Sequence, residues 1–352
     1  MDRRNFGKKL TTAAITISLP YLGSSHIENK MEDKRDRKLI KPKRLKPGDT
    51  IGLITPASPI SEAQLDKTIQ NIEGLGFKVE FNRKRILTKN GYLAGSDLMR
   101  ADEINLMFDN PNIDGIWCVR GGYGVTRILD MLNYKVIRQN PKVLIGYSDI
   151  TALHQAIYKK TGLVCFHGPV GASTFTDYTQ KHVKSMITNP QEIYKIEYAK
   201  ENGDKENDIF RPYTITEGVS EGELIGGNLT LAASLLGTDY DVNYDNKLVF
   251  FEDVGEKPYR IDRMLTQMLL AGKFKKVKGI ILGVFYNCET TDGDDSLTLK
   301  DVLIDRFKYL TVPIIYGMSF GHIENQFTLP LGIKARLDTS DKSITLLESA
   351  VI

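Results

Sequence analysis

The chain has 352 residues and is 41% hydrophobic, which is enough apolar content for a folded core and a length typical of two domains. It carries 47 Lys and Arg against 44 Asp and Glu, a net charge of +3, so its composition does not indicate a nucleic-acid-binding protein. The three cysteines are too few and too widely spaced for a disulfide framework, and no Cys/His cluster predicts a metal site. We expect Cys118 and Cys165, which lie in apolar runs, to be buried core thiols.

The first 25 residues have the features of an export signal rather than of a folded domain. Arg3-Arg4-Asn5-Phe6 forms a twin-arginine pattern, and a modest apolar stretch follows at 10–22. That stretch is too short and too rich in Thr and Ser for a membrane span. We therefore predict a twin-arginine signal peptide over 1–25 and a periplasmic protein, the alternative being a cytoplasmic protein with a disordered or amphipathic tail. Residues 26–46 are charged and aperiodic and are expected to form a spacer.

Short apolar strands alternate with helical segments between residues 47 and 175. We predict strands at 51–54, 77–81, 115–119, 142–145 and 163–166, and helices at 61–74, 96–108, 125–132 and 149–159. Most of these strands are continuous apolar runs, which is typical of a parallel sheet covered by helices on both faces. The pattern predicts an N-terminal α/β domain over residues 47–175.

A polar, charged segment separates this domain from a second one. Residues 176–221 are expected to form a linker or a peripheral segment, and a second domain is predicted over 222–352. Its predicted elements are helices at 229–236 and 262–271 and strands at 247–251, 277–285, 312–315, 335–338 and 343–347. The last two strands alternate between apolar and polar residues, as edge strands do.

Ser148 stands between a predicted strand and a predicted helix. A serine at such a turn exposes its hydroxyl in front of the helix N-terminus, where free N–H groups favour developing negative charge. The segment is similar to a G-x-S-x-G nucleophile elbow, except that Ile150 replaces the second glycine. Serine is also a preferred helix cap, so the local sequence alone favours a structural role.

A nucleophilic serine needs a general base and an orienting carboxylate. Among the five histidines, His167 and His322 both follow plausible strand or loop positions, and the residues alone do not choose between them. Glu252 follows an apolar strand, where a carboxylate is costly unless it is paired. It could serve as the orienting group, or it could form an ion pair with Arg260 or Arg263.

Backbone amides near Ser148 could stabilise an oxyanion. The amide of Asp149 is the natural first donor, and Gly121 or Gly122 could supply the second because glycine allows close backbone approach. The segment that holds these glycines, Arg120-Gly-Gly-Tyr-Gly124, matches neither of the usual phosphate-loop patterns.

Several separated segments resemble those of the LD-carboxypeptidases, also called muramoyltetrapeptide carboxypeptidases. They are TPAS (55–58), RGGYG (120–124), GYSDIT (146–151), HGP (167–169), GGNL (226–229), FEDVGEKPYRIDRML (251–265) and FGHIENQFTLPLG (320–332). The resemblance implies a glutamine amidotransferase-like α/β domain followed by a swivelling β/α domain. It also implies that no metal or other cofactor is needed and that the protein is a homodimer.

The same resemblance implies roles for individual residues. Ser148 would be the nucleophile, Glu252 the carboxylate and His322 the base, which leaves His167 as a structural residue or part of the site wall. Asn228 of GGNL would belong to the oxyanion-binding or substrate-binding residues, together with the glycines of RGGYG and Asp149.

The implied reaction removes the terminal D-alanine from a peptidoglycan tetrapeptide by way of an acyl-enzyme. Two alternatives remain: a peptidase of the microcin C7 self-immunity type, and a non-catalytic protein that binds wall peptides. An intact set of Ser, Glu and His argues against the binder. Export would place the activity in the periplasm, whereas family members that recycle cell wall usually act in the cytoplasm.

Overall fold

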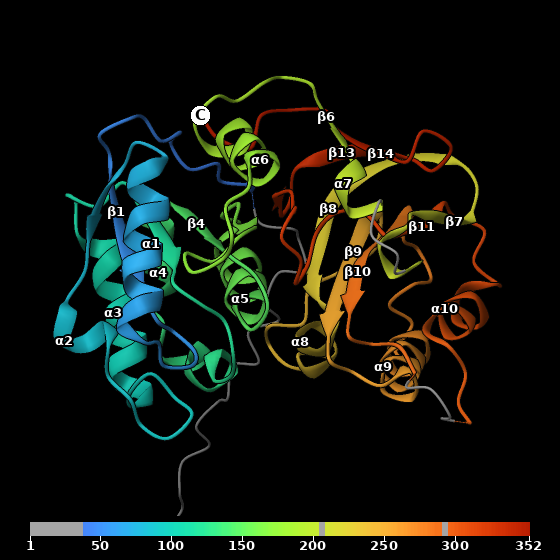
Figure 1. Ribbon diagram of the computed structural model, residues 1–352, viewed down its shortest axis with the longest axis horizontal. Coiled ribbons are helices and arrows are strands. Elements are labelled where there is room, and N and C mark those ends of the chain that lie inside the picture. Colours follow the sequence, from blue (N-terminus) through green and yellow to red (C-terminus); the bar gives the residue numbers. More distant parts are fainter. Residues whose placement is uncertain (1–37, 204–207, 291–294) are drawn as a thin grey trace, which may run out of the picture. The chain divides into compact units, whose positions relative to one another are not determined.

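The computed structural model describes residues 38–203, 208–290 and 295–352. The predicted signal peptide and most of the predicted spacer lie outside these ranges. Within them, no helix has the length and apolar character needed to cross a membrane. The described residues form two α/β domains, each built on one sheet (Figure 1).

The first domain contains a six-stranded sheet with the strand order β12-β5-β4-β3-β1-β2. Its parallel strands are β1 (Thr50–Ile54), β2 (Lys78–Glu80), β3 (Gly115–Cys118), β4 (Val143–Gly146) and β5 (Phe166–His167). The sixth strand, β12 (Leu329–Pro330), comes from near the C-terminus and pairs antiparallel to β5. The predicted parallel sheet is therefore confirmed, and a segment of the distant C-terminal region completes its edge.

Helices cover both faces of this sheet, as the continuous apolar strands predict. They are α1 (Glu62–Gly74), α2 (Arg83–Ile86), α3 (Asp97–Asp109), the 3₁₀-helix η1 (Val125–Met131), α4 (Tyr134–Gln139) and α5 (Ile150–Thr161). Leu65 of α1 shares a core with Leu53 of β1, whereas Ile104 of α3 packs in a second core with Ile54. Successive residues of β1 thus point to opposite faces of the sheet, and both faces are buried.

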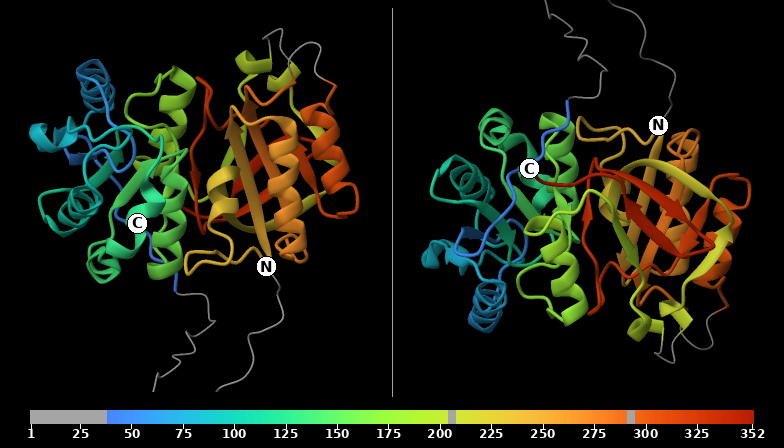
Figure 2. Two further views of the ribbon diagram at one scale, coloured as in Figure 1. Left: turned by 90° about the horizontal axis from the view of Figure 1, so that it is seen from below. Right: turned by 90° about the horizontal axis from the view of Figure 1, so that it is seen from above.

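The second domain contains an eight-stranded mixed sheet with the order β6-β14-β13-β8-β9-β10-β11-β7. Its strands are β6 (Tyr194–Glu197), β7 (Tyr213–Thr216), β8 (Val219–Asn228), β9 (Lys247–Val254), β10 (Gly279–Tyr286), β11 (Ile314–Tyr316), β13 (Lys334–Asp338) and β14 (Ser343–Leu346). The four central strands β8 to β11 are parallel, and the flanking ones are antiparallel. Helices α8 (Leu229–Ser234), α9 (Pro258–Leu270) and α10 (Leu299–Phe307) pack side by side in this domain (Figure 2).

Two features of this domain differ from the prediction. The segment 176–221, predicted to be a linker or a peripheral segment, is not a linker, because it forms α6 (Asp177–Ile187), α7 (Lys200–Gly203), the 3₁₀-helix η2 (Asp208–Phe210), and the strands β6 and β7. Both strands lie at edges of the sheet, and β6 alternates between buried and exposed residues, which explains the polar composition. Strands β13 and β14 are interior strands, since β6 covers the outer side of β14.

Helix α5 lies between the two sheets (Figure 1). On the side facing the second domain, Gln155 Nε2 donates a 3.2 Å hydrogen bond to the carbonyl of Gly226 in β8. Thr151 packs so closely against Gly227 that a Cβ there would lie 2.5 Å from the threonine methyl. The helix that begins after Ser148 therefore rests directly on β8 of the second domain.

Candidate active site

Ser148 occupies a strained turn between β4 and α5. Its φ is 65°, in the left-handed region that non-glycine residues rarely adopt. Such strain costs about 1–3 kcal/mol and is concentrated at functional sites. The turn also explains the departure from the usual elbow, because a Cβ at Gly146 would lie only 3.0 Å from the Cγ2 of Ile150. Gly146 therefore makes room for Ile150, which occupies the position of the second glycine in the usual G-x-S-x-G motif.

Gly121 of the RGGYG segment lies against Ser148. A Cβ on Gly121 would lie 2.8 Å from Ser148 Cβ and 3.1 Å from its Oγ, so no other residue fits without a shift. Gly122 has a φ of 118° and lies against Ser58, whose hydroxyl accepts a 3.1 Å hydrogen bond from the Tyr123 amide. The backbone of this loop is thus held within reach of the serine.

Asp149 follows Ser148 and anchors the turn through its side chain. Its Oδ2 accepts a 2.8 Å hydrogen bond from the amide of Val125, at the start of η1. Burial raises the pKa of this carboxyl to about 6. The side chain is therefore structural, whereas its main-chain amide directly follows the serine, where an oxyanion donor is required.

Glu252 and His322 meet in the second domain. Glu252 lies in β9 and is fully buried, and its Oε2 is 2.7 Å from His322 Nδ1. A carboxylate can only accept, so the imidazole must carry its proton on Nδ1, which leaves Nε2 as the basic nitrogen. Gly321 permits this approach, since a Cβ there would lie 2.9 Å from the same carboxylate oxygen.

The contact between Glu252 and His322 shifts the pKa of each residue so that its charged form is favoured. Burial acts to raise the pKa of Glu252, but the charge and the hydrogen bond of His322 outweigh it and hold the pKa below its usual value. Burial likewise acts to lower the pKa of His322, and the Glu252 carboxylate outweighs it and raises that pKa above its ordinary value of 6.5. The imidazole is thus a stronger base than a free histidine.

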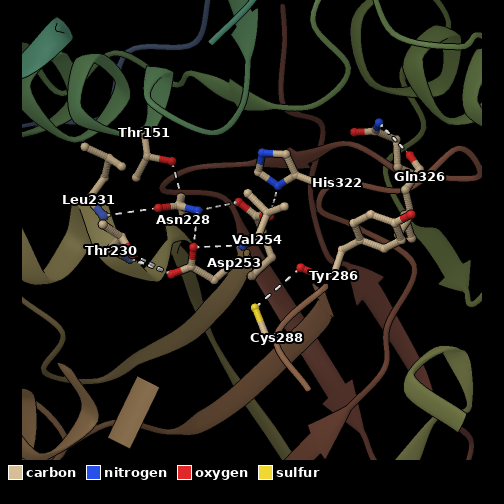
Figure 3. A network of polar contacts seen from close by, with 12 residues as sticks. Thr151, Asn228, Thr230, Leu231, Asp253, Val254, Tyr286, Cys288, His322 and Gln326 are labelled. Carbon is tan, nitrogen blue, oxygen red and sulfur yellow. Dashed lines mark hydrogen bonds and ion pairs between the residues drawn. The ribbon is translucent and has the colours of Figure 1, made fainter. Parts of the chain in front are cut away.

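A network of hydrogen bonds holds the Glu252 carboxylate through its other oxygen, which is not the one bonded to His322 (Figure 3). The side-chain amide of Asn228 donates to Glu252 Oε1 at 3.3 Å and to Asp253 Oδ1 at 3.1 Å. Its oxygen accepts from the amide of Leu231 at 3.2 Å and caps α8, and its own main-chain amide donates to Thr151 Oγ1 at 2.9 Å. Asn228 therefore connects the carboxylate in β9 with the helix that follows Ser148.

This placement differs from the predicted role of Asn228 as an oxyanion-binding or substrate-binding residue. Both N–H groups of its amide are used by carboxylates, and the residue is buried. The structure gives it a positioning role instead. Asp253, which directly follows Glu252 after the same apolar run, belongs to the same network and accepts from the Thr230 amide at 2.9 Å.

The structure also separates the two histidines that the residues left open. His167 is fully buried among aromatic rings, and neither ring nitrogen has a hydrogen-bond partner within the described ranges. Burial lowers its pKa to about 4, so it stays neutral. Its ring packs against Tyr147 with 6.1 Å between centroids, whereas the ring of His322 is bonded to the Glu252 carboxylate. Of the other histidines, His182 in α6 is bonded to the Tyr194 hydroxyl at 2.8 Å.

A pocket of about 300 Å³ opens beside His322. Tyr147 forms part of its wall, with its ring edge-on to the imidazole at 4.7 Å between centroids. Tyr286 and Gln326 line the same pocket and lie on the side of His322 opposite to Thr151 and Asn228 (Figure 3). The imidazole is therefore the boundary between a buried network and an open cavity.

The described residues contain no candidate metal centre and no exposed cysteine. In the described parts of the chain, no group of three or more His, Cys, Asp or Glu residues could hold a metal ion. All three cysteines are buried and free, as predicted for Cys118 and Cys165.

Both domains match models of a known protein family. Residues 51–168 match the LD-carboxypeptidase N-terminal domain, and residues 221–337 match the LD-carboxypeptidase C-terminal domain. The chain belongs to the LD-carboxypeptidase family. As a member of this family it is a serine-type peptidase, which removes the non-catalytic binding protein from the alternatives.

The similarity to individual members of the LD-carboxypeptidase family extends over both domains. A Bacillus subtilis protein named "Probable murein peptide carboxypeptidase" is 38% identical over 307 residues, which are 87% of this chain and 94% of the relative. The structure of the microcin C7 self-immunity protein MccF superposes with a TM-score of 0.78 at 28% identity, covering 89% of this chain and 100% of that one. A muramoyltetrapeptide carboxypeptidase from Oxalobacter formigenes superposes with a TM-score of 0.71 at 28% identity, covering 84% and 97%.

Proposed function

We propose that this protein releases the terminal D-alanine from peptidoglycan tetrapeptides, by cleaving the bond between the L-centre of a diamino acid and D-alanine. The relatives named for murein peptides and for muramoyltetrapeptide support this choice of substrate. The observation that carries the proposal is the buried Glu252 bonded to His322 in one domain, together with the strained Ser148 at the start of the helix that contacts that domain.

In this proposal Ser148 attacks the carbonyl carbon of the diamino acid. Nε2 of His322 takes the hydroxyl proton, while Glu252 holds Nδ1–H and stabilises the imidazolium that forms. The negative charge on the carbonyl oxygen is met by the amide of Asp149 and by an amide of Gly121 or Gly122. The helix N-terminus behind the serine adds to this stabilisation.

Collapse of the tetrahedral intermediate completes the proposed cycle. His322 returns its proton to the amine of D-alanine, which leaves, and an ester remains on Ser148. Water then attacks the ester with His322 again as the base, and the tripeptide is released. No step needs a group beyond those of the chain and water.

Incubation of the purified full chain with defined wall peptides tests this proposal. Mass spectrometry should show loss of one alanine from the tetrapeptide and none from the pentapeptide, with the same rate in EDTA. Absence of tripeptide would overturn the proposal. A rate that falls with chelation and returns with added metal would point to a metal-dependent enzyme.

A second candidate is cleavage of an acyl-sulfamoyl nucleoside, as in microcin C7 self-immunity. The TM-score of 0.78 with MccF, which has been crystallised with aspartyl sulfamoyl adenosine, favours it. The segment 252–263 resembles the carboxypeptidases more closely, so we place this reaction second. Turnover of aspartyl sulfamoyl adenosine that exceeds turnover of the tetrapeptide at equal concentration would reverse that order.

We further propose that the protein is exported through its twin-arginine segment and acts as a homodimer in the periplasm. N-terminal sequencing of protein recovered from fractionated cells tests export, because a processed N-terminus in the periplasmic fraction is expected. Light scattering coupled to size-exclusion chromatography tests the dimer. An intact N-terminus in the cytoplasmic fraction, or the mass of one chain, would contradict the respective proposal.

A further inference from the structure

We infer that the pocket beside His322 is a subsite for a side chain that ends in an ammonium group, and that Glu324 is the residue that selects it. The inference rests on the proposed function, in which the attacked carbonyl belongs to a diamino acid. It adds the part of the substrate that the pocket takes and the charge that it requires.

The walls of the pocket suit the carbon stem of such a side chain. Phe210 and Tyr286 both line it, with ring centroids 6.4 Å apart, and Ile323 adds an aliphatic surface. Long cationic side chains commonly lay their methylene groups along apolar surface and keep the charged end in a polar environment. A volume of about 300 Å³ has room for a four-carbon chain with its ammonium group, and far exceeds the methyl group of alanine.

The charge of the pocket points to the same ligand. Glu324 lines it, is exposed and forms no ion pair with any residue of the described ranges. Among the described residues that line the pocket, none is lysine or arginine, so apart from the His322 imidazole the charge that a substrate group meets there is that of Glu324. An ammonium group would form a charge pair with this carboxylate.

The position of the pocket matches the chemistry at Ser148. His322 and Tyr147 belong both to the pocket wall and to the immediate surroundings of the nucleophile, since Tyr147 precedes Ser148 and packs on the imidazole. The side chain of the diamino acid starts at the carbon next to the attacked carbonyl. In our inference this side chain extends past Tyr147 and His322 into the cavity while its carbonyl is at Ser148.

Two tetrapeptides that differ only at the third residue test this inference. One carries L-lysine and the other carries L-norleucine, which keeps the carbon stem without the ammonium group. For the wild-type protein we expect KM to be about two- to fivefold lower for the lysine peptide, with similar kcat, because a charge pair with an exposed carboxylate contributes at most about 1 kcal/mol to binding. Glu324→Gln should raise KM for lysine to the norleucine value and leave norleucine unchanged.

Glu73→Gln is the matched control, because Glu73 is exposed on α1 and does not line the pocket. It should retain the wild-type ratio of KM values. A Glu324→Gln protein that keeps the wild-type preference for lysine, or a wild type that does not distinguish the two peptides, would overturn the inference while leaving the proposed function in place.

A binding measurement decides the inference even if no D-alanine is released. Titration calorimetry on Ser148→Ala, with and without Glu324→Gln, should give a lower Kd for the lysine peptide only when Glu324 is present. Loss of turnover in the wild type would then count against the proposed function alone. Equal Kd values for the two peptides in the presence of Glu324 would count against the subsite.

Discussion

Replacing Glu252 with glutamine removes one charge from the site and keeps the shape of the side chain. Glu252 is fully buried, bonded to His322 at 2.7 Å and to Asn228 at 3.3 Å. The single oxygen of glutamine can accept from the imidazole at the place of Oε2, but its NH2 group then faces the Asn228 amide, so the network loses one hydrogen bond. We expect Glu252→Gln to fold with a somewhat lower melting temperature, and rates are compared at a temperature at which both proteins are folded.

The magnitude follows from the hydrogen bond that changes. A hydrogen bond to a charged group contributes about 1.5–3 kcal/mol, and Glu252 makes this contribution to the imidazolium that exists in the transition state. At about 1.4 kcal/mol per factor of ten, kcat should fall by about 10–150-fold. The pKa of His322 is raised by the Glu252 charge, so the acid limb of the pH–rate profile should move to lower pH.

Initial rates of D-alanine release between pH 5 and 9 measure both effects. Glu103→Gln is the control, because Glu103 is another buried carboxylate, located on α3 and bonded to the Thr55 amide rather than to a histidine. It should leave the acid limb in place. An unchanged kcat in Glu252→Gln, or an acid limb that does not move, would refute the assignment of the dyad.

Three further predictions concern the same site. In the wild type, kcat/KM should rise with pH and level off above the pKa of His322, which lies above 6.5. The reason is that only the neutral imidazole can accept the serine proton. A kcat/KM that falls over this pH range would contradict the assignment. Gly121→Ala should lower kcat at least about tenfold, because its Cβ would lie 2.8 Å from Ser148 Cβ, whereas Gly74→Ala, with no atom within 4 Å, should be neutral. Asn228→Ala should reduce kcat, because Glu252 loses a hydrogen-bond donor, and should lower the melting temperature, because α8 loses a cap worth about 1 kcal/mol. A rise in KM alone would instead favour the substrate-binding role expected from the sequence.

Much of the first domain could be predicted because its signals are local. The buried parallel strands are continuous apolar runs, and Ser96, a residue type that favours the N-cap, caps α3 by accepting from the Met99 amide at 3.2 Å. In the second domain α9 begins at Pro258, earlier than predicted, because proline at the first helical position marks a start that apolar spacing alone does not.

Other elements carry no apolar pattern that could reveal them. Strand β8 contains two glutamates and three glycines, yet it is central in the sheet. Its glycines serve close packing, since a Cβ on Gly226 would lie 1.8 Å from the carbonyl oxygen of Phe250. Helix α10 was not among the predicted elements, although Thr298 and Asp301 form a capping box in front of an apolar series.

In the candidate site, too, some features could be predicted from local sequence and others depend on tertiary contacts. Motif resemblance was enough to select His322 over His167, but the burial that keeps His167 neutral depends on rings from both domains, Phe250 among them. Likewise, the role of Asn228 depends on Asp253 and Thr151, which are distant in sequence from each other. Tertiary contacts of this kind leave no trace in local spacing.

The rate of D-alanine release by Ser148→Ala tests the central claim most directly. Removing Oγ should lower kcat by at least about a thousandfold, with tetrapeptide still bound and the melting temperature close to that of the wild type. Relief of the backbone strain at φ 65° is not expected from alanine, so the fold should be affected little. Turnover within tenfold of the wild-type rate would show that Ser148 is not the nucleophile.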